Sequence, residues 1–360
     1  MYRTSSFGRV AVLASVALIA ALSLEGFSTT RHLKRKRQHA RGNGAVLWRD
    51  PGNIRKRDLY YGPGSKELAP KPPFRFVKEV KEGGMPKFDV EDARGVKWRV
   101  KLGPEARAET VATRLVWAVG YNAEESYYFD RAHIDGPPKL SRGQKYVEGQ
   151  SVRGARFEPR RDNVERGKRW GWSKNPFKGT RELNGLKTMM VLLNNWDVFK
   201  KNNGILHVKD PASNKTEARY TVTDLGATLG SAAGFGGHRS KNNVQDFERS
   251  RLVSKVKDGN VKFDYNLKPK KFGLLSFAYP PYYLRQRKAT NQMNKVPIDH
   301  AAWIGSQLAQ LSDDQLRDSF RAAGYDRATS EAYVRALRHR INELNRLRDA
   351  ELAERQRRVR

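Results

Sequence analysis

Two short stretches of the sequence decide the fold that it indicates, NWDVFKKNN at 195–203 and VTDLG at 222–226. The first places Asp197 five residues before Asn202, and the second places Asp224 two residues before a glycine. Phosphoryl transfer needs a carboxylate near the attacking hydroxyl, and it needs carboxylate and amide ligands for Mg²⁺. These two stretches supply both kinds of group in a fixed order.

The segments around these stretches have clear periodicity. Apolar residues at 183, 186, 190 and 193 recur at helical spacing, and this helix is expected to end at Asn194 and Asn195. The segments 204–208 and 218–223 are expected to form a hairpin around a polar turn at 210–214. Three more helices are expected at 301–311, 313–323 and 330–347, the second opened by a capping box of Ser312 and Gln315.

An antiparallel sheet is expected before this region. Strand patterns cover 74–80, 87–90 and 96–102, and a turn at 92–95 joins the last two. A helix follows from Pro104, with Gly120 as its stop, and another strand covers 126–129. The sequence therefore predicts an α+β fold, with a small antiparallel sheet and one helix in front of a mostly helical part.

Lys101 ends the third strand, on the face opposite Val100 and Leu102, so its amine can point away from the core. Glu109 lies one turn into the following helix, where its carboxylate could reach back to that amine, and Glu105 is the competing partner. Taken alone, Lys101 also fits a plain solvated strand.

Asp197 with an amide five residues later, then a hairpin, then Asp-Leu-Gly, resembles the catalytic loop and metal motif of protein-kinase-like folds. The pattern is more similar to the atypical branches (phosphoinositide, HipA-type and secretory-pathway kinases), because no His-Arg-Asp precedes the loop and Leu225 stands where Phe is usual. The resemblance implies a bilobal fold that binds ATP with Mg²⁺ or Mn²⁺.

The resemblance also implies residue roles. Asp197 would orient or deprotonate the acceptor hydroxyl, and Asn202 and Asp224 would ligate the metal, with Asn203 as an alternative to Asn202. Lys101, paired with Glu109, would hold the phosphates of the nucleotide. Gly83 and Gly84 would form the loop over those phosphates, although they fall short of the full Gly-x-Gly-x-x-Gly.

The expected organisation is a bilobal chain with flanking segments. The N-lobe covers 74–130 and the C-lobe 181–347, joined by an irregular insertion or linker at 131–180 and followed by a charged tail at 348–360. In the insertion, Trp170 and Trp172 are either ligand contacts or packing residues. Residues 226–237, rich in Gly and Ala, stand in the place of an activation segment, or they are a plain surface loop.

The N-terminus is expected to direct export. Arg3 and Arg9 precede an apolar run at 10–24, and small residues at 21 and 23 fit a cleavage site, so 1–28 is interpreted as a signal peptide. An N-terminal membrane anchor and a buried core helix are the alternatives. The segment 29–73 is expected to be a basic linker, and its dense charge at 31–41 opposes translocation.

Composition bounds the possible functions. The chain has 70 Lys and Arg against 38 Asp and Glu, a formal charge of +32, so anionic surfaces or polymers should attract it. The absence of Cys excludes thiolate zinc sites and cysteine nucleophiles, and seven scattered His give no metallohydrolase pattern. Three functions follow: an exported or envelope-associated kinase acting on a protein, sugar or lipid hydroxyl; a pseudokinase; or a basic protein that binds nucleic acid, membrane or an acidic polymer.

Overall fold

The computed structural model describes residues 44–136, 139–210, 214–233, 238–268 and 280–347, with the single residues 349 and 356. The chain divides into two units, residues 1–45 and 46–360, and β1 (Ala45–Val46) crosses their boundary. The leader expected at 1–28 and the basic run at 31–41 lie outside the described residues, so both stay predictions. None of the helices in the described ranges is both long and apolar enough to span a bilayer.

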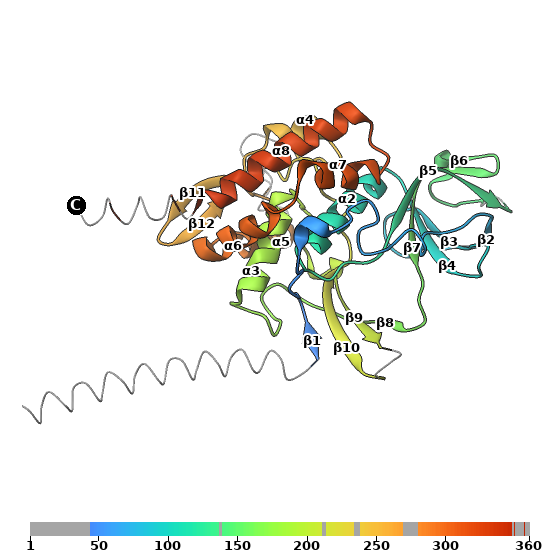
Figure 1. Cartoon of the computed structure of the whole chain (residues 1–360), viewed down its shortest axis with the longest axis horizontal. Helices are drawn as coiled ribbons and strands as arrows, with labels where there is room; N and C mark the ends of the chain where they lie inside the picture. Colours follow the sequence, from blue (N-terminus) through green and yellow to red (C-terminus); the bar gives the residue numbers. More distant parts are fainter. Residues whose placement is uncertain are drawn as a thin grey trace, which may run out of the picture. The chain divides into compact units, whose positions relative to one another are not determined.

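The unit 46–360 has an α+β fold with a β-rich N-terminal region and a largely helical C-terminal part (Figure 1). The elements of the first region are η1 (Ile54–Lys56), β2 (Phe74–Glu79), β3 (Lys87–Glu91), β4 (Lys97–Leu102), α2 (Glu105–Ala118), β5 (Tyr127–Asp135), η2 (Gln144–Tyr146), β6 (Val147–Glu148) and β7 (Ser151–Pro159). The strands and the helix expected between 74 and 129 are all present.

The first sheet is larger than the small antiparallel sheet expected, and it closes on itself. Its strand order is β4-β3-β2-β5-β7-β6, and β7 also pairs with β4, so five strands close into a ring. One pairing, between β2 and β5, is parallel. Closure removes the exposed edge that an open sheet would leave on β4.

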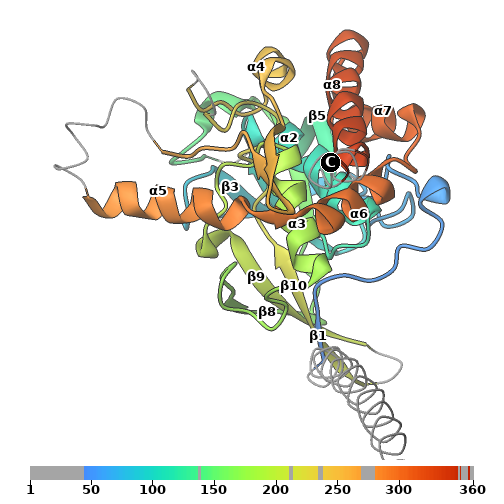
Figure 2. The same cartoon turned by 90° about the vertical axis from the view of Figure 1, so that its left-hand side faces the viewer.

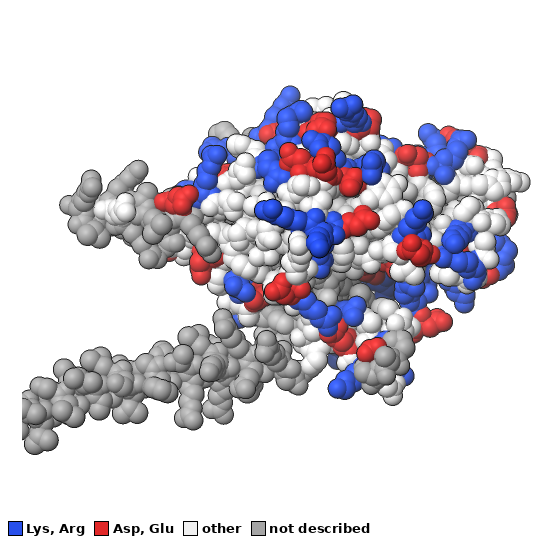
Figure 3. Space-filling view, viewed as in Figure 1, with Lys and Arg blue, Asp and Glu red and all other residues white. Residues whose placement is uncertain are grey.

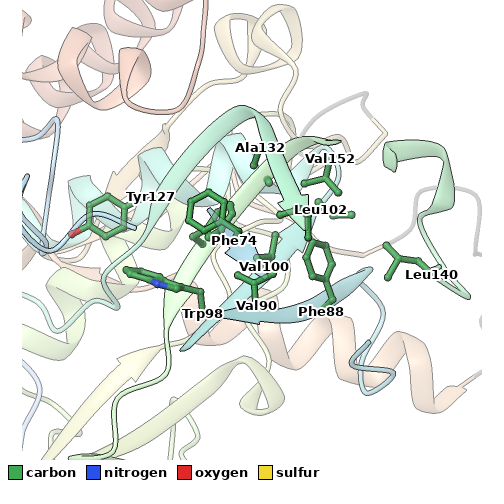
Figure 4. Close-up of a cluster of buried hydrophobic side chains, with 13 residues drawn as sticks. Phe74, Phe88, Val90, Trp98, Val100, Leu102, Tyr127, Ala132, Leu140 and Val152 are labelled. Carbon is green, nitrogen blue, oxygen red and sulfur yellow. The ribbon is translucent and has the colours of Figure 1, made fainter. Parts of the chain in front are cut away.

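Alternation of side chains along β4 fixes which residues enter the core of this barrel. Trp98, Val100 and Leu102 are fully buried in the apolar cluster shown in Figure 4, whereas Lys97, Arg99 and Lys101 project from the other face. The cause is the two-residue period of a strand. The outer face is the one on which α2 supplies Glu109 to Lys101.

The expectation of irregular structure over 131–180 was wrong for about half of the segment. Residues 151–159 form β7, the strand that closes the barrel, and β8 (Val164–Arg169) pairs with β9 (Asn203–Lys209). In β8 the charged residues are mostly exposed, whereas in β7 Arg156 and Glu158 are buried among apolar residues. In both strands the charges interrupt the apolar runs by which strands are found.

The C-terminal part is built around the expected helices. Its elements are α3 (Arg181–Leu192), η3 (Lys200–Asn202), β9, β10 (Thr216–Val222), α4 (Val244–Arg249), β11 (Val253–Lys257), β12 (Asn260–Phe263), α5 (Pro280–Met293), β13 (Val296–Pro297), α6 (Ile298–Leu308), α7 (Asp313–Arg321) and α8 (Arg327–Asn345). The hairpin β9–β10 and the capping box of Ser312 and Gln315 are confirmed. Figure 2 shows α5 running outward from beside α3 and α6.

The expectation of an extended linker up to residue 73 was wrong for the described part of that segment. Leu47, Ile54 and Leu59 are buried. The Gln315 side chain of α7 donates hydrogen bonds to the carbonyls of Ile54 and Arg57, at 2.9 and 2.8 Å. A segment with buried apolar side chains and satisfied carbonyls is part of the folded body.

The surface carries both signs of charge. On the face seen in Figure 3, Lys and Arg side chains lie among Asp and Glu side chains instead of forming one unbroken patch. The basic arm expected at 34–37 lies outside the described residues, and the tail expected at 348–360 is described only at 349 and 356.

Candidate active site

Lys101 and Glu109 meet as the sequence indicates. The Lys101 amine donates a hydrogen bond to Glu109 Oε1 at 3.2 Å, and their side chains are 19 % and 5 % exposed. Glu105, the competing partner, forms an ion pair with Lys241 instead. The strand β4 and the helix α2 therefore hold a nearly buried cation and carboxylate against each other.

The sequence analysis missed two charged partners of this pair, Arg156 and Glu158 on β7. Glu158 Oε1 lies 3.0 Å from the Lys101 amine. Arg156, almost completely buried, forms ion pairs with Glu158 and with Glu109 Oε2, the latter at 3.2 Å. Two cations and two carboxylates thus form a closed cluster, which we call the quartet.

A signal for these residues was present in the sequence. Arg156 and Glu158 alternate with Ala155 and Phe157, which are fully buried in the barrel core. Lys101 shows the same alternation on β4, and it lies directly opposite Arg156 in the β4–β7 pairing. The pairing of β4 with β7 could not be found without the tertiary structure, because 54 residues lie between Lys101 and Arg156 in the sequence.

The charges of the quartet shift its pKa values in opposite directions. Burial lowers the pKa of Lys101, but Glu109 and Glu158 outweigh burial and raise it above its usual value. Burial raises the pKa of Glu109 to about 7, against the opposing effect of Arg156 and Lys101. Burial also acts to raise the pKa of Glu158, yet Lys101 and Arg156 lower it overall. Lys101 is therefore a fixed cation at neutral pH.

Asp224 lies close enough to affect this cluster. Its carboxylate raises the pKa of Lys101, after burial and the other three quartet residues, and it raises the pKa of Glu109, after burial, Arg156 and Lys101. Asp224 is half-buried, and its Oδ1 accepts a hydrogen bond from the backbone N–H of Gly226 at 3.3 Å. Residues more than a hundred positions apart, on β4 and after β10, thus share one electrostatic environment.

The register of the β9–β10 hairpin places Asn202 next to Asp224. Val222 pairs with Asn203, and the backbone N–H of Thr223 donates to the carbonyl of Asn202 at 2.8 Å. Asp224 is the next residue along the chain. Both amides are buried: Nδ2 of Asn202 donates to the carbonyl of Asp197, and Nδ2 of Asn203 donates to the carbonyl of Trp170, so the amide oxygen of either is the atom that could bind a metal ion.

The loop that carries Asp197 is closed on itself. Asn194, after α3, has a positive φ of 52°, and the Asn195 side chain accepts from the backbone N–H of Asp197 at 3.0 Å. The Asn202 side chain donates to the carbonyl of Asp197 at 2.7 Å. The Asp197 side chain is 20 % exposed, and Lys201 is its ion-pair partner at 3.4 Å. Its carboxylate is therefore accessible rather than packed against the core.

A carboxylate and an amide in this arrangement fit a magnesium ion that also binds phosphates. Mg²⁺ is usually held by one or two carboxylates, with waters and substrate oxygens completing its octahedron. In the described ranges no group of three or more His, Asp or Glu side chains could hold a metal ion without such help. Asp224 and Asn202 match the composite kind of site.

Gly83 and Gly84 lie in the turn between β2 and β3. Gly83 has a positive φ of 74°, and its carbonyl accepts from Arg142 at 2.6 Å. The following strand begins at Lys87, which pairs directly with Lys101. The turn thus lies at the Lys101 end of the sheet, as a loop over bound phosphates would require.

The two tryptophans of the 131–180 segment pack inside the protein. Trp170 and Trp172 are each 3 % exposed and contact each other edge to face, and Trp170 donates to the carbonyl of Thr221. Of the two alternatives, ligand contact and packing, the burial favours packing. In the segment expected to act as an activation loop, Leu229 and Ala232 are buried, while 234–237 are outside the described residues.

The structure is similar to three solved kinase structures. The Helicobacter pylori proinflammatory kinase CtkA matches with 12 % identity and a TM-score of 0.41, over 77 % of this chain and 98 % of that chain. The Golgi casein kinase matches with 10 % identity and a TM-score of 0.35, over 82 % of each chain. The same kinase with Mn/ADP bound matches with 9 % identity and a TM-score of 0.30, over 90 % of this chain and 89 % of that one.

No protein-family model matches the sequence, and no curated protein resembles it significantly. Because the TM-scores of these three structures are below 0.5, their likeness by itself supports no statement about activity. The function has to be inferred from the chain's own residues.

Proposed function

We propose that the chain is a metal-dependent phosphotransferase that uses ATP. The observation that carries this proposal is the convergence of four distant groups: Lys101 held by Glu109, with Asp224 in the same electrostatic environment and Asn202 beside Asp224. A plain solvated strand has no reason to bury a lysine between two carboxylates, because removing such charges from water is costly.

Each residue has a proposed task. Lys101 binds phosphate oxygens of ATP, and the quartet fixes the position of its amine. Asp224 and Asn202 hold Mg²⁺ or Mn²⁺, which neutralises charge on the transferring phosphoryl group. Asp197 orients the acceptor hydroxyl and takes its proton as the oxygen attacks the γ-phosphorus and ADP leaves. Gly83 and Gly84 cover the phosphates.

The acceptor class and the place of action are further parts of the proposal. We expect a protein, sugar or lipid hydroxyl as the acceptor, and export to the envelope or beyond it, guided by the N-terminal segment. The catalytically inactive pseudokinase is the alternative with the same fold. The formal charge of +32 favours one other candidate, a basic protein that binds an anionic polymer, nucleic acid or membrane surface.

Thermal unfolding with and without nucleotide tests the proposal. ATP with Mg²⁺ or Mn²⁺ should raise the melting temperature, because a ligand that binds only the folded state stabilises it. The variant Asp224→Ala should lose metal-dependent ATP turnover, since removing a fixed electrostatic contact to the reacting group costs several kcal/mol, about 10²-fold or more in rate.

A matched control is Asp246→Ala, which removes another aspartate of the C-terminal part, in α4. It should leave turnover unchanged. Absence of stabilisation by any nucleotide, with either metal, argues against the proposal. Salt-sensitive binding to anionic polymers that ignores Asp224→Ala would favour the basic-protein alternative.

A further inference from the structure

The outer face of the barrel carries an unusual row of cations. In the pairing of β3, β4 and β7, Lys87 lies directly opposite Lys101, and Lys101 lies directly opposite Arg156. Like charges placed directly opposite each other on a sheet are destabilising. The repulsion among these three cations therefore destabilises the folded protein unless other charges offset it.

The neighbouring row shows how the same face is balanced elsewhere. There, Arg99 lies between Asp89 and Glu158, and it forms an ion pair with Asp89. Signs alternate across the three strands in this row. Of these two rows, only the row that contains Lys101 places like charges opposite each other.

Lys87 is the cation that remains unmatched. Glu109 and Glu158 contact Lys101 and Arg156, but within the described part of the chain no carboxylate forms an ion pair with Lys87. Lys87 is nevertheless half-buried. Burial lowers the pKa of its amine, and Lys101 and Arg99 lower it further, against a smaller attraction from Glu82 and Glu158.

The Lys87 amine points toward the glycine turn. A Cβ placed on Gly83 would lie 3.3 Å from Lys87 Nζ. The turn is held from its other side by Arg142, which donates to the carbonyls of Gly83 and Lys81, both at 2.6 Å. The Lys87 amine thus lies at the turn, on the residue that pairs with Lys101, and an anion bound there would offset the repulsion.

We propose that Lys87 is a second polyphosphate-binding cation, which together with Lys101 selects nucleoside triphosphates and other polyphosphates. The inference deepens the proposed function and rests on the same site. Lys101 contacts two carboxylates, whereas within the described ranges Lys87 forms an ion pair with none, so Lys87 adds most of the positive charge that a polyphosphate would meet. The anion that Lys87 binds must carry several charges to bridge both amines.

The test compares three variants of the full chain by calorimetry and thermal unfolding. Lys87→Met removes the charge, Lys87→Arg keeps it, and Lys97→Met is the control, an exposed lysine at the other end of the same face of β4. The probes are ATP with Mg²⁺, inorganic tripolyphosphate and adenosine.

Lys87→Met should weaken ATP and tripolyphosphate binding about tenfold to a hundredfold, as expected for a hydrogen bond to a charged group, and should leave adenosine binding unchanged. The unliganded Lys87→Met protein should melt no lower than wild type, because a like-charge contact is relieved. Lys87→Arg should retain most of the affinity, and Lys97→Met should behave as wild type.

Three results would overturn the inference. The first is that Lys87→Met and Lys97→Met bind polyphosphates with equal affinity, and the second is that wild type does not bind tripolyphosphate. The third is that Lys87→Met melts below wild type and binds adenosine and ATP equally more weakly. The failures of the two proposals are separable. Phosphotransfer without any Lys87 dependence refutes only the inference, and Lys87-dependent tripolyphosphate binding without turnover of ATP refutes only the phosphotransferase.

Discussion

Removing one carboxylate of the quartet should destabilise the whole protein strongly. At a Lys101–Glu158 separation of 3.0 Å the Coulomb attraction is about 5.5 kcal/mol at an effective dielectric constant of roughly 20. Glu158→Gln leaves Lys101 and Arg156 to share Glu109 alone. Breaking a buried pair costs about 3–5 kcal/mol, and the remaining Glu109 places this variant at the lower end, about 3 kcal/mol.

Urea unfolding followed by circular dichroism measures this free energy, and Glu148 supplies a matched control. Glu148 also forms ion pairs with two arginines, Arg131 and Arg153, but its side chain is 38 % exposed against 5 % for Glu158. Because solvent screens exposed pairs, Glu148→Gln should cost no more than about 1 kcal/mol.

The double variant Arg156→Gln/Glu158→Gln separates charge balance from packing. It removes one charge of each sign, so it should cost about 2 kcal/mol less than the sum of the two single variants. Strict additivity, or equal costs for Glu158→Gln and Glu148→Gln, would refute the claim that the quartet acts as one balanced unit.

Three other outcomes are expected. Asp197→Asn should lower phosphotransfer by about 10²–10⁴-fold, the usual contribution of a general base, while ATP binding measured by calorimetry changes little. Arg340→Met should lower the free energy of unfolding in urea by about 3 kcal/mol, because the buried Arg340 donates to the carbonyls of Leu192 and Ser250, which would lose their partner. Burial acts to raise the pKa of Asp92, but hydrogen bonds from backbone N–H groups outweigh burial and lower it. The Asp92 carboxylate therefore stabilises the folded protein fully at a pH above its pKa in the unfolded chain, and this stabilisation is lost as the pH falls through its pKa in the folded protein. Asp92→Asn should therefore flatten the acid limb of stability against pH, and an unchanged acid limb would contradict this assignment.

Local pattern was sufficient for elements whose signal lies within one segment. The helix α3, the hairpin β9–β10 and the capping box at Ser312 depend on contacts between residues near each other in sequence, and all three are present as expected. The order Asp197, Asn202, Asp224 belongs to the same class, because hairpin register brings Asn202 beside Asp224 without help from the rest of the chain.

Elements that depend on distant partners were missed. α4, α5 and the sheet β11–β13 have too few apolar residues to reveal their period, and the charged residues of β7 conceal its strand pattern. Burial of Ile54 under α7 could not be anticipated either, since a basic, Gly- and Pro-rich segment resembles a linker until its partner helix is known.

The sequence by itself determined an α+β chain with a β-rich beginning and a helical end, and it placed a lysine, a glutamate and two aspartates at positions suited to phosphate chemistry. Only the tertiary structure decided that β7 closes the barrel beside β4, and hence that Arg156 and Glu158 contact Lys101 and its partners. It likewise decided that Lys87 pairs with Lys101 across the sheet and has no carboxylate partner among the described residues. The physical reason is the separation in sequence of the residues involved. Periodicity and turns depend on residues a few positions apart, whereas charge balance depends on which strands lie side by side in the sheet.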